Sequence, residues 1–207
     1  YYRTVFPESG RLEQADEILT NAYLHSRNYD AAIAHFESID RRTPILEEAF
    51  QKVTFLKGTE LFNTQKFSAS VDLFDISLEH GVNREYVIKA WIWKGEAYAI
   101  GNRTEEAEAC YAAVFRNDPD GRTEEYLRAR YGMGYILFNR KEYERALVHF
   151  KYYTDALRGA QDPLNFTDAL TRLADCYYTT KQYDRALLVL NEVLKREAGS
   201  EDYAYFR

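Results

Sequence analysis

The sequence has few residues that break helices or fix a covalent framework. Its 207 residues include only 4 prolines, 10 glycines and 2 cysteines. So few breakers among many helix formers favour an all-α fold. Cys110 and Cys176 lie far apart in the sequence, and neither belongs to a CxxC pair. We therefore expect no disulfide framework and interpret both cysteines as small buried side chains.

The sequence also lacks a long apolar run and a concentration of basic residues. No apolar segment approaches the roughly 20 residues that are needed to cross a bilayer, so we expect no membrane insertion by this chain. The formal net charge is −6, and lysine and arginine are interspersed with aspartate and glutamate. Because binding to nucleic acid requires a concentrated positive face, we expect no nucleic acid partner.

What the sequence does contain is a regular spacing of small and large side chains. Starting from Gly95, the positions 3, 9, 12 and 16 residues later hold Tyr98, Thr104, Ala107 and Tyr111. With Thr104 as the one clear departure, the same pattern recurs from four other starting residues, which are Thr20, Gly58, Gly134 and Ala174. We call these five starting residues anchors and number the positions of each repeat from its anchor, so that Tyr111 is at +16.

Helix geometry explains this spacing. A small residue on the face that also carries a large one lets a second helix approach closely. Short polar connectors such as NTQK and TTKQ suit a tight turn between two antiparallel helices. Each repeat is therefore predicted to be a helical hairpin that must stack on its neighbours to bury its apolar face. Helix starts are expected after Thr43-Pro44, Thr123 and Asp162-Pro163.

The segment AWIWKGEAYAIGNRTEEAEACYAAVFRNDP resembles the tetratricopeptide repeat (TPR) family in its tryptophan, glycine, tyrosine, alanine and closing proline. The resemblance covers nearly the whole chain. It implies a right-handed α-solenoid of stacked antiparallel helix pairs, with about five repeats plus truncated ends. The sequence departs from the family at Thr20, which replaces a small residue, and at Lys57 and Lys94, where the family usually has leucine.

We expect residues 1–207 to form a single TPR-like superhelical domain. The predicted repeats cover 9–44, 45–82, 83–119, 120–161 and 162–198, with 1–8 ending a preceding repeat and 199–207 starting a following one. Met133 is the only methionine, so the chain is interpreted as a piece of a longer protein with flanking repeats. The long repeats resemble multi-TPR proteins of bacterial cell envelopes, which favours a bacterial periplasm or envelope over the cytoplasm.

No catalytic or metal-binding pattern is evident in the sequence. The four histidines include no pair at metal-ligand spacing and no HExxH motif. The DPDG segment lacks the glutamate spacing of a calcium loop and is interpreted as a turn between repeats. Gly58, Gly95 and Gly134 are expected inside helices, which excludes a phosphate-binding loop. We therefore expect no enzyme activity, no metal site and no cofactor.

The family resemblance implies that the first helix of each hairpin lines a concave groove. The candidate partner-binding residues on these helices are Phe55, Phe62, Lys89, Ile92, Trp93, Glu96, Arg128, Tyr131, Tyr135, Phe138, Arg172, Asp175 and Tyr178. Large aromatic residues beside charges are typical of interface hot spots. The alternative is that several of these rings only seal the junctions between hairpins, because helix phase does not separate the two roles.

The carboxylate clamp of chaperone-binding family members is not expected here. Asn21 faces Glu17 instead of a lysine, and later lysine positions hold Phe55, Ile92 and Tyr131. We therefore do not expect binding of an acidic chaperone tail.

The sequence thus predicts a non-catalytic scaffold that binds a peptide or helix of an unidentified partner protein in its concave groove. One alternative is a structural spacer in a larger multi-repeat envelope protein, with self-association through uncapped repeat ends. Another is a regulatory module attached to an enzyme outside this segment.

Overall fold

The described part of the chain is built from α-helices alone. The computed structural model describes residues 11–39, 42–160 and 165–196, and within them it contains no strand. The helices are α2 (Leu12–Ser26), α3 (Tyr29–Glu37), α4 (Pro44–Asn63), α5 (Phe67–Glu79), α6 (Arg84–Ile100), α7 (Thr104–Asn117), α8 (Glu124–Asn139), α9 (Tyr143–Leu157), α10 (Phe166–Thr179) and α11 (Tyr183–Arg196). The prediction of an all-α fold is confirmed.

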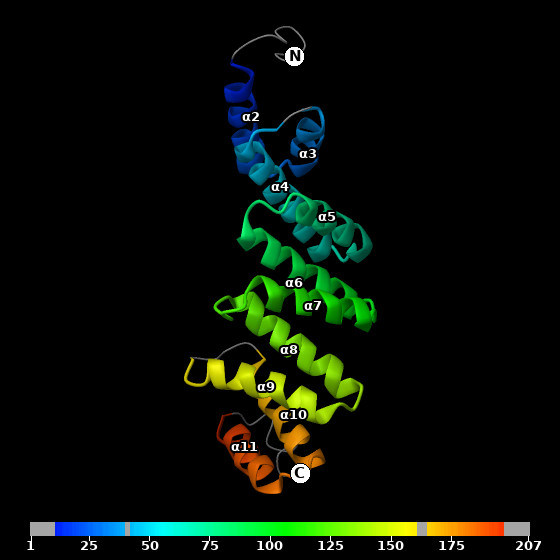
Figure 1. Cartoon of the computed structure of the whole chain (residues 1–207), viewed down its shortest axis with the longest axis vertical. Helices are drawn as coiled ribbons and strands as arrows, with labels where there is room; N and C mark the ends of the chain where they lie inside the picture. The colour runs from blue at the N-terminus through cyan, green and yellow to red at the C-terminus, as the bar shows by residue number, and fades with distance from the viewer. Residues whose placement is uncertain (1–10, 40–41, 161–164, 197–207) are drawn as a thin grey trace. The chain divides into compact units, whose positions relative to one another are not determined.

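The helices follow one another as pairs joined by short turns. The pairs are α2 with α3, α4 with α5, α6 with α7, α8 with α9, and α10 with α11 (Figure 1). This confirms the predicted construction from helical hairpins. The chain divides into two compact units, residues 1–113 (unit 1) and residues 114–207 (unit 2), and the boundary falls within α7. Each unit is described by itself below.

Capping residues explain where two of the first helices begin. The Thr43 side-chain oxygen accepts a hydrogen bond from the Leu46 N–H at 3.4 Å. The Thr123 hydroxyl does the same for the Tyr126 N–H at 3.2 Å. Both threonines satisfy a backbone donor that the helix itself leaves without a partner. The third expected helix start, at Asp162-Pro163, lies outside the described residues.

The turn inside every hairpin has the same backbone conformation. Position +7 is left-handed in all five repeats, at Arg27, Gln65, Asn102, Lys141 and Lys181, with φ between 54° and 64°. In each turn the N–H at +8 donates to the carbonyl at +3, as from Lys66 to Leu61 at 2.9 Å and from Gln182 to Tyr177 at 2.8 Å. This is the Schellman arrangement that ends an α-helix. Glycine is the usual residue at such a left-handed position, and none of the five turns uses it.

The anchors pack directly against the large residues at +16. A β-carbon added to Gly58 would lie 2.7 Å from a ring carbon of Phe74. At Gly95 the corresponding distance to Tyr111 would be 2.8 Å. The two helices of a hairpin therefore approach so closely that only a very small residue fits between them. In the last repeat, where the anchor is alanine, the smaller Leu190 stands at +16, and both residues belong to one buried cluster.

Successive hairpins within a unit bury their apolar faces against each other. In unit 1, Phe36 of α3 packs on Phe50 of α4 with ring centroids 5.3 Å apart. In unit 2, Leu157 of α9 packs against the buried cluster of the next hairpin, which includes Leu170 of α10 and Leu190 of α11. Such burial drives the stacking of hairpins that are unstable alone.

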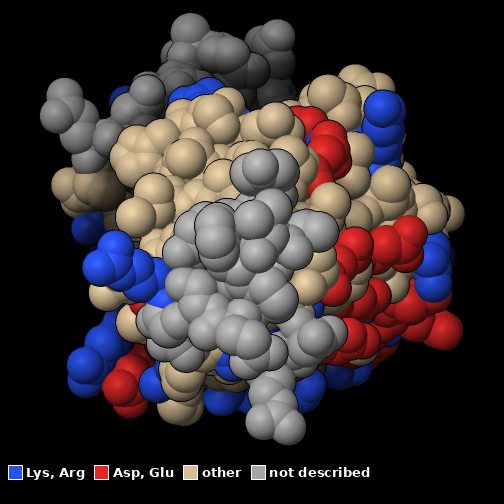
Figure 2. Space-filling view, turned by 90° about the horizontal axis from the view of Figure 1, so that it is seen from above, with Lys and Arg blue, Asp and Glu red and all other residues tan. Residues whose placement is uncertain are grey.

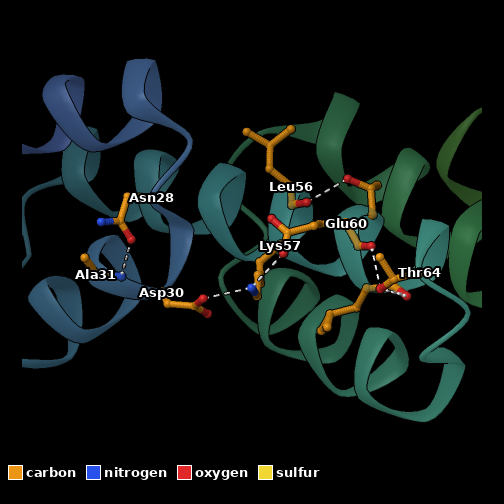
Figure 3. Close-up of polar contacts among 9 residues, drawn as sticks. Asn28, Asp30, Ala31, Leu56, Lys57, Glu60 and Thr64 are labelled. Carbon is orange, nitrogen blue, oxygen red and sulfur yellow. Dashed lines mark hydrogen bonds and ion pairs between the residues drawn. The ribbon is translucent and has the colours of Figure 1, made fainter.

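Two departures from the family pattern are explained by ion pairs. The Lys57 ammonium lies 2.9 Å from a carboxylate oxygen of Asp30, on the second helix of the preceding hairpin, and 2.9 Å from Glu60 (Figure 3). Lys94 forms the equivalent contact with Asp75 of the preceding hairpin. The apolar contact that a leucine would make at this position is therefore replaced by charge pairing between hairpins.

Candidate binding surfaces on the first helices

The first helices of unit 1 carry a half-buried pair of aromatic rings. Phe62 of α4 and Trp93 of α6 meet edge to face, with centroids 4.9 Å apart. Phe62 also contacts Phe67 at 5.2 Å. Edge-to-face packing of this kind holds both rings in fixed orientations while leaving part of their surface accessible.

Two other candidates in unit 1 have almost no accessible surface. Ile92 is fully buried, and Phe55 is 6% exposed. Phe55 packs on Phe74 at 6.0 Å and on Tyr86 at 5.5 Å. Both residues stand at position −3, which is buried in these two repeats. Of the two roles that helix phase left open, the structure places Phe55 and Ile92 in packing.

The charged candidates of unit 1 are engaged at the surface. Lys89 forms an ion pair with Glu85, one turn earlier in α6. Glu96 accepts a hydrogen bond from the Tyr111 hydroxyl at 3.5 Å. Each is only partly exposed, so their charges lie beside the aromatic pair without being fully hydrated.

The first helices of unit 2 share a polar network centred on an aspartate. Oxygen Oδ2 of Asp168 in α10 accepts hydrogen bonds from two hydroxyls of α8, from Tyr131 at 2.8 Å and from Tyr135. The two tyrosine rings also contact each other, with centroids 5.0 Å apart. One carboxylate therefore connects the first helices of two consecutive hairpins.

Arg172 extends this network along α10. Its Nε donates to the Tyr135 hydroxyl at 3.2 Å, and its Nη1 donates to Asp175 Oδ2 at 3.2 Å. The guanidinium carbon lies 5.5 Å from the centre of the Phe138 ring. Asp175 is only 4% exposed. Its hydrogen bonds and its contact with the Phe138 ring thus hold the guanidinium in one orientation.

The electrostatics of this network keep both tyrosines protonated. Burial raises the pKa of the Tyr131 hydroxyl, and its hydrogen bond to Asp168 raises it further. The pKa of Tyr135 is raised by the same two causes. Both side chains therefore act as neutral donors that hold Asp168 in one orientation.

The remaining candidates of unit 2 lie on the same two first helices, α8 and α10. Tyr178 is 46% exposed and packs on Tyr183 with centroids 5.5 Å apart. Phe138 contacts Tyr143 at 5.4 Å. Arg128 is partly exposed on α8, and its charge acts on the buried Tyr153 hydroxyl.

Asp168 is the central residue of the network. The family resemblance puts it at a groove position of the last repeat, but it is not among the candidate partner-binding residues chosen from those positions. It stands at position −6, which it shares with two predicted residues, Lys89 and Arg128. Position −6 holds a basic residue in the third and fourth repeats and the acidic Asp168 in the fifth, and this change of charge was the sequence signal that could have singled out Asp168.

Both cysteines are free thiols in buried positions. Burial raises the pKa of the Cys110 thiol to about 11 and that of Cys176 to about 12, so both are neutral at physiological pH. Across the described residues, no group of three or more His, Cys, Asp or Glu side chains is arranged to hold a metal ion. Figure 2 shows acidic side chains gathered along one side of the face in view, with basic side chains spread around its margin.

None of the described helices combines the length and apolar character that crossing a bilayer requires.

Comparison with known proteins identifies what the chain is similar to. One family model described as tetratricopeptide repeat matches residues 137–207. A second model with the same description matches residues 55–122 and 102–160, which together span about half of the chain. Among curated proteins, none matches the sequence significantly.

Several solved structures share the fold. BtubC (BKLC) from P. vanneervenii is 13% identical with a TM-score of 0.64, over 90% of this chain and 80% of that one. YrrB is 15% identical with a TM-score of 0.59, over 94% and 91%. MamA from Desulfovibrio magneticus RS-1 is 15% identical with a TM-score of 0.57, over 88% and 93%. Identities this low support the fold alone, an α-solenoid of helix pairs.

Proposed function

Because this chain belongs to the tetratricopeptide repeat family, we propose that it binds a peptide or a helix of a partner protein on the accessible faces of its first helices. Proteins of this family generally mediate protein–protein interactions and are generally non-catalytic scaffolds. The structurally similar YrrB is described as a TPR protein with an unusual peptide-binding site. That description supports a peptide as the class of ligand.

The observation that carries the proposal is a pair of contacts that recurs in both units. Position +4 of one hairpin meets position −2 of the next, as Phe62 with Trp93 in unit 1 and as Phe138 with Arg172 in unit 2. All four side chains are partly exposed. Rigid aromatic surfaces beside oriented charges bind partners with little loss of side-chain entropy.

A pull-down with the full 207-residue chain tests this proposal. The bait is compared with the Phe62→Ala/Phe138→Ala variant, and recovered proteins are quantified by mass spectrometry. A matched control, Val148→Ala/Leu188→Ala, removes apolar side chains that are 57% and 70% exposed on second helices. We expect partner recovery to fall with the first variant and to persist with the control. Equal recovery by all three folded baits would contradict the proposal.

Self-association is a second candidate, supported by exposed apolar side chains at two helices. Ile18 of α2 is 71% exposed, and Leu187 of α11 is 61% exposed. Apolar side chains so exposed on repeat helices can stack on another copy. Light scattering over a range of concentrations, compared with Leu187→Glu, tests this. A strict monomer at high concentration would contradict it.

A further inference from the structure

The carboxylate of Asp168 has one oxygen in use and one available. Oδ2 accepts the hydrogen bonds of Tyr131 and Tyr135. Oδ1 forms an ion pair with Arg172, whose Nε lies 3.8 Å away, but at that distance it accepts no hydrogen bond from the guanidinium. Among the described residues no donor reaches Oδ1, and the Asp168 side chain is 38% exposed. The aspartate therefore presents a fixed acceptor to solvent.

The charges around this acceptor favour a cation. Asp168 and Asp175 both lie close to the guanidinium of Arg172. Further out, Glu124 and Arg128 act on the neighbouring Tyr153 with opposite signs and offset each other. Together, these three carboxylates and two guanidinium groups carry one more negative charge than positive charge. An acidic ligand would meet the exposed Asp168 carboxylate and an arginine that is already paired.

We propose that unit 2 binds a peptide segment carrying a lysine or arginine side chain, whose cation bonds to Oδ1 of Asp168. The aliphatic part of that side chain lies along the accessible surfaces of the nearby rings, Tyr135 and Phe138. The two tyrosine hydroxyls fix the carboxylate before binding, so little reorganisation is needed. This inference rests on the proposed function, since it names the chemistry of the partner for the same surface.

Selection from a peptide library supplies a defined probe. Random dodecapeptides displayed on phage are selected on the immobilised full chain, and an enriched peptide is labelled for fluorescence anisotropy. We expect the enriched peptides to share a lysine or arginine at one aligned position. The expected affinity also falls as the salt concentration rises, because the contact is electrostatic.

Substitutions on both sides of the contact then locate it. Asp168→Asn keeps the acceptor for the tyrosines but removes the charge, and it is expected to weaken binding at least about tenfold. Replacing the peptide lysine or arginine by norleucine leaves the protein unchanged and is expected to weaken binding equally. The two changes together should cost no more than either alone. Asp184→Asn, at an exposed aspartate on α11, is the matched control and should have no effect.

The outcomes separate this inference from the proposed function. Peptides that lose affinity with Phe138→Ala but not with Asp168→Asn would overturn the cation contact and leave the binding surface intact. Peptides enriched in acidic residues would overturn it as well. Binding that neither protein variant affects would overturn the inference alone, because the proposed function also includes the surface of unit 1. Enrichment of no peptide would overturn the inference together with the proposed function.

Discussion

Gly134 and Phe150 touch across the hairpin of α8 and α9, where an added β-carbon would lie 2.9 Å from the phenylalanine ring. Phe150 is fully buried and cannot swing away. We therefore expect Gly134→Ala to lower the free energy of unfolding by about 1–3 kcal/mol, despite the better helix propensity of alanine.

The natural pairing of Ala174 with Leu190 shows how the cost can be offset. Adding Phe150→Leu to Gly134→Ala should recover at least about 1 kcal/mol relative to the sum of the two single changes. Urea denaturation of the four proteins measures this coupling. Strictly additive effects would contradict the packing account of the anchor.

Thr20 places a hydroxyl at an anchor position without a hydrogen bond. The residue is 4% exposed, and among the described residues no partner reaches its Oγ1. Removing such a group with Thr20→Ala should raise the free energy of unfolding by about 1 kcal/mol. The control is Thr54→Ala, because that buried hydroxyl donates to the Phe50 carbonyl at 2.9 Å and its loss should be destabilising. Thermal melting measures the midpoint of both variants. Equal changes in melting temperature for Thr20→Ala and Thr54→Ala would contradict the prediction for Thr20.

Replacing the left-handed residues at position +7 by glycine should stabilise the fold. Lys141 and Lys181 have φ of 64° and 61°, which costs a residue with a β-carbon more than it costs glycine. Lys141→Gly and Lys181→Gly are each expected to stabilise the chain by about 0.5–1 kcal/mol. The same substitution inside a helix, Lys151→Gly, should instead destabilise by about 1 kcal/mol. Denaturation midpoints that fall for the turn variants would contradict this account of the turns.

His149 should make the fold sensitive to acid. Burial, with the nearby charges of Arg130 and Arg145, lowers its pKa from 6.5 to about 4. The ring also stacks on Phe115 at 5.9 Å and contacts Arg130 at 3.4 Å. Between these two pKa values the unfolded chain binds more protons than the folded one, so stability falls as the pH drops from 6.5 towards 4 and is unaffected above 6.5.

The size of this acid effect is on the order of 2 kcal/mol between pH 6.5 and about pH 5. His149→Gln should remove that part of the pH dependence. Urea denaturation of the two proteins across this range measures the difference. Parallel stability curves for the two proteins would show that His149 remains free to protonate.

The sequence predicted the packing inside hairpins better than the contacts between them. The contacts between the anchors and the residues at +16 could be predicted from side-chain size, because a small residue on one helix makes room for a ring on the other helix of the hairpin. Lys57 and Lys94 looked like exceptions, since their partners Asp30 and Asp75 lie on other hairpins and at different repeat positions. Contacts between hairpins depend on side-chain reach, which spacing does not encode.

The candidate surface shows the same limit. Phe55 and Phe62 both lie on the predicted face of α4, yet Phe55 is buried against Tyr86 while Phe62 keeps accessible surface. Helix phase gives the direction of a side chain but not the depth at which a neighbouring helix covers it. The resemblance puts Asp168 at a groove position, but its central role in the network could not be predicted because it depends on two hydroxyls from another hairpin.

The shared turn conformation has a consequence for how this chain can evolve. Because the bend of each hairpin is held by backbone hydrogen bonds, the side chain at +7 takes no part in forming it and is exposed in all five repeats. Side chains as different in size and charge as arginine and asparagine therefore occupy these sites on the same backbone conformation, so the turns should tolerate many substitutions there.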